Sequence, residues 1–144
     1  MSSGAKANVL VTQSGGCTPV MNRSLAAIVR EALEHRVIGQ IYGSRHALDG
    51  VLIEDLIDLR RISRASWDRI ARTPGAALGS SRRKLQTEDV TRVLAALSKH
   101  NIGYWFIIGG NDSADTGHTM AIESQTAGYP LKVVNVPKTI DNDL

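Results

Sequence analysis

The stretch Tyr104-Trp105-Phe106-Ile107-Ile108-Gly109-Gly110-Asn111-Asp112-Ser113 joins an unbroken apolar run to a short polar turn. A continuous apolar run of this length is typical of a strand buried inside a parallel sheet. The two glycines allow the backbone after the strand to approach a ligand closely. The stretch therefore predicts a buried strand that leads directly into a candidate binding loop.

Strand and helix patterns alternate on both sides of this strand. The expected strands are 7–12, 37–42, 104–108 and 131–136, and the expected helices are 20–34, 66–71 with Ser66 as its cap, one that begins at Thr87, and 114–127. Residues 47–59 have a mixed pattern. Such alternation predicts an α/β fold, a three-layer sandwich around a mainly parallel sheet. No repeat or linker is evident, so we expect residues 1–144 to form a single domain.

Composition sets the broad class of the protein. Its 144 residues are 42% hydrophobic and 22% charged, which is ordinary for a globular domain. No apolar run approaches the roughly 18 residues that a membrane span needs, and the N-terminus lacks a signal peptide's apolar core. Cys17 is the only cysteine, which excludes an internal disulfide, and we interpret it as a small packing residue. We expect a cytoplasmic protein without a membrane partner.

Positive charge is concentrated in residues 60–84. The basic residues there are Arg60, Arg61, Arg64, Arg69, Arg72, Arg82, Arg83 and Lys84, and Asp68 is the only acid. The segment suits an anionic ligand, but a solvated helix face followed by a basic loop explains the same pattern. It has no interleaved aromatic residues and no recognition motif, so we expect no nucleic-acid partner.

Unusual residues occur in three loops, residues 13–20, 109–113 and 135–144, each of which follows a predicted strand. In open α/β sheets, ligands bind beyond the carboxyl ends of the strands. The three loops are therefore expected to converge on one pocket.

Two glycine turns are candidates for anion binding. Gly15-Gly16 and Gly109-Gly110 each lie between a strand and a helix, where backbone N–H groups attract an anion. An ordinary structural turn remains an alternative for both. Asp112 is interpreted either as a helix N-cap or as a carboxylate for metal binding or ligand selection. Neither the Walker pattern nor G-x-G-x-x-G is present.

The last loop combines Lys138 with Asp141 and Asp143. Carboxylates two residues apart on an extended loop reach one ligand, so one can accept a proton from a hydroxyl while the other orients it. A lysine can neutralise a transferred phosphoryl group as a point charge. A polar chain end is the alternative interpretation.

A second possible metal group lies on one helix. Asp112, Asp115 and His118 recur at three-residue spacing and can share a helix flank. A solvated face is the favoured explanation of that spacing.

These motifs resemble those of phosphofructokinases. Residues 14–22 resemble the family's first glycine loop, 78–82 the segment that ends in a phosphate-bridging arginine, 109–113 the donor and magnesium loop, and 137–143 the catalytic loop. The resemblance implies a two-part α/β family fold, of which this chain resembles the first half. It also implies catalysis, with Asp141 as the base for a sugar 1-hydroxyl, Asp143 in support and Lys138 as a further catalytic residue.

The resemblance also assigns ligand contacts. It implies that the donor is bound by Gly15, Gly16, Arg82, Gly110, Asp112, Ser113 and Lys138, and the sugar phosphate by Thr139, Ile140 and Asp141. Magnesium is expected at Asn111 and Asp112. The family usually has aspartate in place of Asn111, and a neutral amide binds magnesium less strongly.

Two residues bear on the identity of the donor. ATP-using members generally have glycine at the position of Asp112, and often at that of Lys138, whereas pyrophosphate-using members resemble this chain at both. A carboxylate about 4 Å from an ATP α-phosphate costs roughly 1–4 kcal/mol at effective dielectrics of 80 to 20. The resemblance thus implies a pyrophosphate-dependent, reversible phosphorylation of fructose 6-phosphate to fructose 1,6-bisphosphate, a glycolytic step.

Several expectations remain alternatives. The enzyme is expected to be a homo-oligomer, and this 144-residue chain, as a fragment of a longer one, is expected to show little turnover alone. An ATP-dependent 6-phosphofructokinase is the alternative on the donor. A non-catalytic phosphate-binding module is the alternative on activity.

Overall fold

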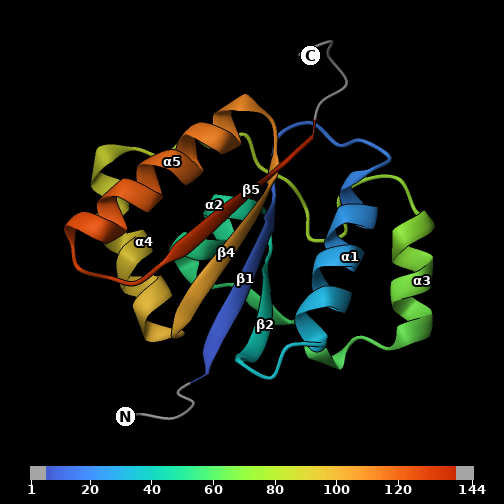
Figure 1. Ribbon diagram of the computed structural model, residues 1–144. Helices are drawn as coiled ribbons and strands as arrows, with labels where there is room; N and C mark the ends of the chain where they lie inside the picture. The colour runs from blue at the N-terminus through green and yellow to red at the C-terminus, as the bar shows by residue number, and fades with distance from the viewer. Residues whose placement is uncertain (1–5, 139–144) are drawn as a thin grey trace.

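The computed structural model describes residues 6–138. The elements are β1 (Ala7–Gln13), α1 (Met21–Leu33), β2 (Ile38–Ser44), α2 (Ala47–Ile53), β3 (Leu56–Asp58), η1 (Leu59–Arg61), α3 (Arg64–Arg72), α4 (Thr87–Lys99), β4 (Ile102–Gly109), α5 (Asn111–Thr126) and β5 (Lys132–Pro137). They form a three-layer α/β sandwich (Figure 1), which confirms the predicted fold class. None of the helices is long and apolar enough to cross a membrane.

A five-stranded sheet in the order β3-β2-β1-β4-β5 forms the middle layer. β1 pairs in parallel with β2 and β4, and β4 pairs in parallel with β5. Only the short strand β3 runs antiparallel, beside β2. Segment 47–59, whose sequence pattern is mixed, forms α2, the antiparallel strand β3 and the first residue of η1.

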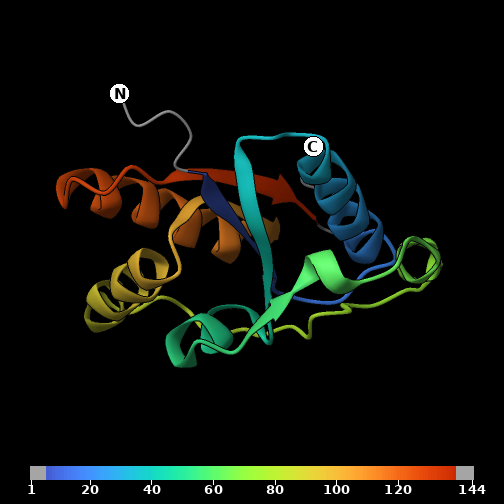
Figure 2. The same cartoon turned by 90° about the horizontal axis from the view of Figure 1, so that it is seen from below.

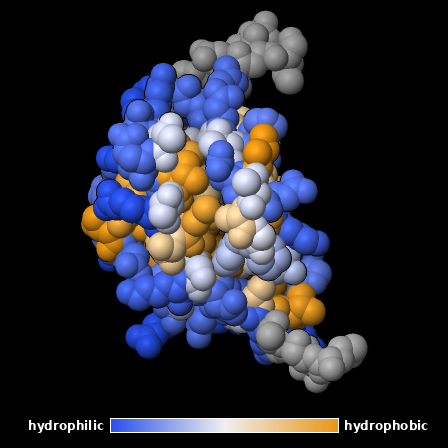
Figure 3. Space-filling model, turned by 90° about the vertical axis from the view of Figure 1, so that its left-hand side faces the viewer, coloured by the Kyte–Doolittle hydropathy of each residue, from blue (hydrophilic) through white to orange (hydrophobic). Residues whose placement is uncertain are grey.

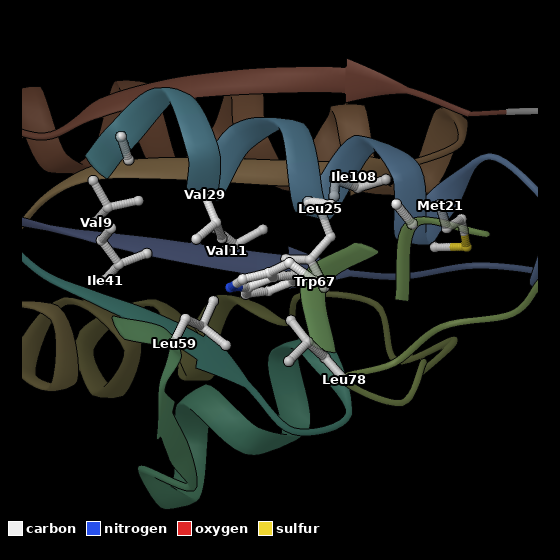
Figure 4. Packing of buried hydrophobic residues seen from close by; sticks show 13 residues of the cluster. Val9, Val11, Met21, Leu25, Val29, Ile41, Leu59, Trp67, Leu78 and Ile108 are labelled. Carbon is white, nitrogen blue, oxygen red and sulfur yellow. The ribbon is translucent and has the colours of Figure 1, made fainter. Parts of the chain in front are cut away.

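Alternate residues of β1 supply two separate cores. Val9 and Val11 face α1 and α3, where they pack with Leu25 and Trp67 (Figure 4). Leu10 points to the opposite face and packs in the core beneath α2, α4 and α5. The view from below shows α1 and α3 on one side of the sheet and α2 and α4 on the other (Figure 2).

The outer face of α4 and α5 is mostly polar. Seen from that side, hydrophilic residues cover much of the surface, and hydrophobic residues appear in its middle and at its edges (Figure 3). α4 is amphipathic and buries Val93, Ala96 and Leu97 towards the sheet, whereas α5 packs there mainly through the small residues Ser113, Gly117 and Ser124 together with Met120.

Two helix starts differ from the prediction. α3 is capped by Ser63, whose Oγ accepts the backbone N–H of Ser66 at 3.1 Å, so Ser66 is the third helical residue and the expected cap was wrong. α5 begins at Asn111, because Gly110 adopts an extended conformation and serves as the N-cap. Asp112 therefore lies inside the first turn, and its interpretation as the N-cap was also wrong.

Candidate functional site

The loops after β1, β4 and β5 meet at the carboxyl edge of the sheet. The Ser14 N–H donates to the Ile108 carbonyl, and the Lys138 N–H donates to the Gly109 carbonyl, each at 2.9 Å. A fourth segment joins them, since the Gly15 N–H donates to the Ser81 carbonyl at 3.1 Å. The parallel strands thus bring together segments that are far apart in the sequence.

A cavity of about 520 Å³ opens between these loops. Its walls contain every predicted site residue that the structure describes: Gly15, Gly16, Arg82, Gly110, Asn111, Asp112, Ser113 and Lys138. The predicted residues Thr139, Ile140, Asp141 and Asp143 lie outside the described residues. The predicted convergence on one pocket is confirmed for residues up to Lys138.

Lys138 brings a buried cation to the first glycine turn. Its side chain is 8% exposed, and its Nζ donates to the Gly16 carbonyl oxygen at 2.5 Å. Gly15 has a φ of +79°, and a Cβ there would lie 3.1 Å from Nζ, so a glycine is required for the close approach. Within residues 6–138 the ammonium group has no carboxylate partner. A buried cation in this state favours an incoming anion.

Two adjacent arginines have different surroundings. Arg83 pairs with the buried carboxylate of Asp89 at 2.9 Å and lies 3.6 Å from that of Asp49. The Gln86 backbone N–H and the Arg83 guanidinium lower the pKa of Asp89 below its ordinary value. Arg82 has no ion pair with the described residues, and its Nη2 lies 3.2 Å from where a Gly16 Cβ would be. Arg83 therefore secures the segment, and Arg82 remains available to a ligand.

The other basic residues of segment 60–84 divide between pairs and solvent. Arg60 donates to the carbonyl oxygen of Gly39 at 2.7 Å, and Arg61 lies 3.3 Å from the Asp58 carboxylate. Arg64 and Arg72 are exposed on α3. For most of this segment the structure thus supports the solvated-face interpretation.

The second glycine turn is shaped by close packing. A Cβ on Gly109 would lie 2.2 Å from the Ser113 hydroxyl oxygen and 2.8 Å from that of Ser14. Those two hydroxyls hydrogen-bond to each other, which ties the first loop to α5. Since Gly110 caps α5 without a side chain, the first backbone N–H groups of the helix are open to an anion at the cavity wall.

Two cavity residues were not recognised from the sequence. Thr18 is 7% exposed, and its hydroxyl oxygen is buried without a hydrogen-bond partner in the described part of the chain. A buried hydroxyl left unpaired costs about 1–3 kcal/mol, so Thr18 is a candidate contact for a bound ligand or water. Cys17 is exposed and lines the cavity, so its interpretation as a packing residue was wrong. A hydroxyl two residues after a glycine pair was the available signal for Thr18.

The described residues contain no cluster of three or more histidine, cysteine or acidic side chains suited to a metal. Asp115 and His118 are exposed on α5, which supports the solvated-face interpretation of that helix flank. Asn111 and Asp112 remain the oxygen donors at the cavity wall.

Comparison with known proteins finds one family and relatives that belong to it. Residues 8–144 match the protein family described as Phosphofructokinase. The pyrophosphate–fructose 6-phosphate 1-phosphotransferase of Rhodospirillum rubrum is 40% identical over 139 residues, which are 96% of this chain and 34% of that enzyme. The ATP-dependent 6-phosphofructokinase of Borreliella burgdorferi is 29% identical over 133 residues, 92% of this chain and 29% of that enzyme.

Among solved structures, a pyrophosphate-dependent phosphofructokinase from Nitrosospira multiformis superposes with a TM-score of 0.91 and 42% identity. The match covers 95% of this chain and 35% of that one. The chain therefore spans about a third of the length of the relatives it matches.

Proposed function

The chain belongs to the phosphofructokinase family, and from that premise we propose that it forms the donor site of an enzyme that phosphorylates fructose 6-phosphate with pyrophosphate. The observation that carries the proposal is the Lys138 ammonium, 8% exposed and held on the Gly16 carbonyl oxygen. A preorganised cation at a glycine turn stabilises a compact anion that has no nucleoside to anchor it.

In the proposed reaction, the Asp141 carboxylate accepts the proton of the sugar 1-hydroxyl, and Asp143 supports this base. The hydroxyl oxygen bonds to one phosphorus of pyrophosphate while the bond from that phosphorus to the bridging oxygen breaks. Inorganic phosphate leaves, and fructose 1,6-bisphosphate forms in a reversible, glycolytic step. Thr139 and Ile140 contact the sugar phosphate in this proposal.

The described residues supply binding and charge neutralisation. Arg82 and Lys138 face the cavity as cations, and the first turn of α5 adds backbone N–H groups. Gly15, Gly16, Gly110 and Ser113 shape the walls so that phosphate oxygens can approach the backbone. Because phosphoryl transfer depends mainly on positioning and electrostatics, these contacts suffice for a donor site.

Asp112 favours pyrophosphate over ATP. Its carboxylate is in the first turn of α5 and lines the cavity. An extended triphosphate brings further negative charge towards it, whereas pyrophosphate needs only the region around Lys138 and Arg82. The runner-up is an ATP-dependent enzyme, which the similarity to the Borreliella burgdorferi enzyme favours.

Magnesium is the proposed metal. It binds through one or two carboxylates together with substrate phosphates, so the amide oxygen of Asn111 and the carboxylate of Asp112 fit a metal that arrives with the donor. When bound, the ion neutralises charge on the phosphoryl oxygens.

We also propose that residues 1–144 act as a single donor-binding domain. A cytoplasmic, homo-oligomeric enzyme is part of the same proposal, and the single cysteine of the chain fits that location. Light scattering of the purified protein measures the oligomer directly.

Calorimetric titration of the 144-residue chain tests the donor assignment. With magnesium present, we expect pyrophosphate to bind at least about tenfold more tightly than ATP, which corresponds to about 1.4 kcal/mol. Tighter binding of ATP would favour the runner-up. Binding of neither would reject the donor site.

A further inference from the structure

We propose that Gln13 and Asn22 are positioning residues, whose buried side-chain amides fix residues 73–78 and thereby hold Arg82 at the cavity. We call this pair the amide latch. The role of Arg82 rests on the proposed function, whereas the latch itself is a property of the described fold.

Gln13 forms the first half of the latch. It is the last residue of β1 and is 0% exposed. Its Nε2 donates to the Met21 carbonyl oxygen at 3.1 Å and to Asn22 Oδ1 at 3.2 Å. Its Oε1 accepts the backbone N–H of Leu78 at 3.0 Å.

Asn22 forms the second half, in the first turn of α1, and is 3% exposed. Its Nδ2 donates to the Thr73 carbonyl oxygen at 2.8 Å, and its Oδ1 accepts the Ala77 backbone N–H at 2.7 Å. A carboxamide donates from one end and accepts at the other, whereas an ionised carboxylate of the same size only accepts and a serine hydroxyl is too short to reach both partners.

The latched segment has no helix or strand of its own. Residues 73–86 join α3 to α4, and their backbone N–H and carbonyl groups need partners outside a regular ladder. The latch supplies these partners at Thr73, Ala77 and Leu78. Leu78 is also anchored by its side chain, which is buried beside Leu59 and Trp67 (Figure 4).

From Leu78 the chain runs directly into the cavity wall. The Ser80 hydroxyl donates to the Gly15 carbonyl at 2.5 Å, and the Ser81 carbonyl accepts the Gly15 N–H at 3.1 Å. Arg82 follows, and no ion pair with the described residues holds its side chain. The position of its guanidinium therefore depends on its backbone, which the latch holds on the amino-terminal side and the Gly15 bonds and the Arg83–Asp89 pair hold nearer to Arg82.

Asn22→Asp is the first test variant, because it keeps the size and the Oδ1 acceptor but loses the donor to Thr73. A control of the same residue type lies on β1, at the opposite end of the strand from Gln13. Asn8 donates to the His100 carbonyl and accepts the Gln40 N–H, each at 2.7 Å, at the opposite end of β1. Asn8→Asp makes the same chemical change far from Arg82.

Two measurements separate the latch from the donor site. By NMR hydrogen exchange, Asn22→Ser, which removes the acceptor of the Ala77 N–H, should speed exchange at Ala77 and Leu78 at least about tenfold, while Asn8→Ser should leave these amides unchanged. By calorimetry, Asn22→Asp should weaken pyrophosphate binding about tenfold, and should add no further loss in an Arg82→Ala background.

The outcomes are distinct. Unchanged exchange at Ala77 and Leu78 would overturn the latch. Faster exchange with an additive loss of binding in the double variant would overturn the positioning of Arg82. Faster exchange in a chain whose wild type does not bind pyrophosphate supports the latch and rejects the proposed donor. Asn22→Ser serves as a neutral second variant, and global unfolding of both variants would overturn the proposal in favour of a purely structural role.

Discussion

The two ends of β1 use similar side chains for different purposes. At the amino end, the Asn8 amide is fully engaged by His100 and Gln40. At the carboxyl end, the Gln13 amide is also engaged, but the neighbouring cavity is lined by Lys138, Arg82 and Thr18, whose hydroxyl has no partner among the described residues. The amino end is satisfied by the protein alone, whereas the carboxyl end retains capacity for a ligand.

This difference shows how one strand serves two roles. Buried polar groups in proteins are normally paired, so a cavity in which a hydroxyl and a cation lack partners within the described residues indicates a binding site. Substitutions at the amino end should therefore change stability alone. Matched substitutions at the carboxyl end should change binding as well.

The largest effect is expected for Lys138, at the carboxyl edge of the sheet, when it is compared with Lys99 at the amino edge. Lys138→Ala should reduce pyrophosphate affinity by about 2–5 kcal/mol, because it removes a buried, hydrogen-bonded charge from the site. Lys99→Ala removes an exposed partner of Glu54 near the amino end of β4 and should leave affinity unchanged. Calorimetry measures both variants, and equal losses would contradict the comparison.

Glycines at the two ends of β4 give the next test. A Cβ on Gly103 would lie 2.6 Å from the Ala7 Cβ, and one on Gly109 would lie 2.2 Å from Ser113 Oγ. Each alanine substitution should therefore lower the free energy of unfolding by about 1–3 kcal/mol in urea titrations. Only Gly109→Ala should also weaken pyrophosphate binding. A loss of binding in Gly103→Ala would contradict the assignment of binding to the carboxyl end of β4.

Donor choice gives a smaller effect. Replacing Asp112 and Lys138 together by glycine should raise ATP affinity by about 1 kcal/mol, or roughly fivefold, because a repelling carboxylate leaves the first turn of α5. Asp115→Gly is the control, because it removes a carboxylate further along α5. A competition titration with ATP measures the shift, and no gain in the double variant would reject these donor roles.

The carboxylates of Glu54 and Asp89 make the stability of the protein depend on pH. Hydrogen bonds from Lys99 and His100 lower the pKa of Glu54 from 4.5, and the Gln86 N–H and Arg83 lower that of Asp89 from 3.8. Because both folded-state pKa values are depressed, their stabilisation is present above these pH values and is lost as the pH falls through them towards the lower folded values. Thermal melts from pH 6 to about pH 3 follow this loss.

Asp89 should account for more of that loss than Glu54. The Asp89 side chain is 3% exposed and that of Glu54 is 34% exposed, so solvent screens Glu54 more strongly. Asp89→Asn should therefore flatten the acid limb of the stability profile more than Glu54→Gln does. The reverse order would show that exposure does not decide the effect.

Local patterns were sufficient to predict much of this molecule. The apolar run at Tyr104–Ile108 and the glycines after it predicted the central strand and one wall of the cavity. Hydrophobic periodicity predicted α1 and α4 because each buries one face against the sheet.

Long-range partners explain what the sequence did not reveal. Gln13 and Asn22 have ordinary identities, and their roles depend on backbone groups more than 50 residues away. The difference between Arg82 and Arg83 depends on the ion pair of Arg83 with Asp89, which the sequence did not indicate, although Asp89 was correctly placed in the first turn of α4. Asp141 and Asp143 lie outside the described residues, so their roles stay predictions.

The contrast between the neighbouring arginines constrains the length of their loop. Arg83 is tied to Asp89 and Arg82 faces the cavity, while Leu78 is fastened in the core. Inserting or deleting one residue between Leu78 and Arg82 would move a different side chain into each place. Homologous chains that keep this site should therefore tolerate changes of residue type in the loop more readily than changes in its number of residues.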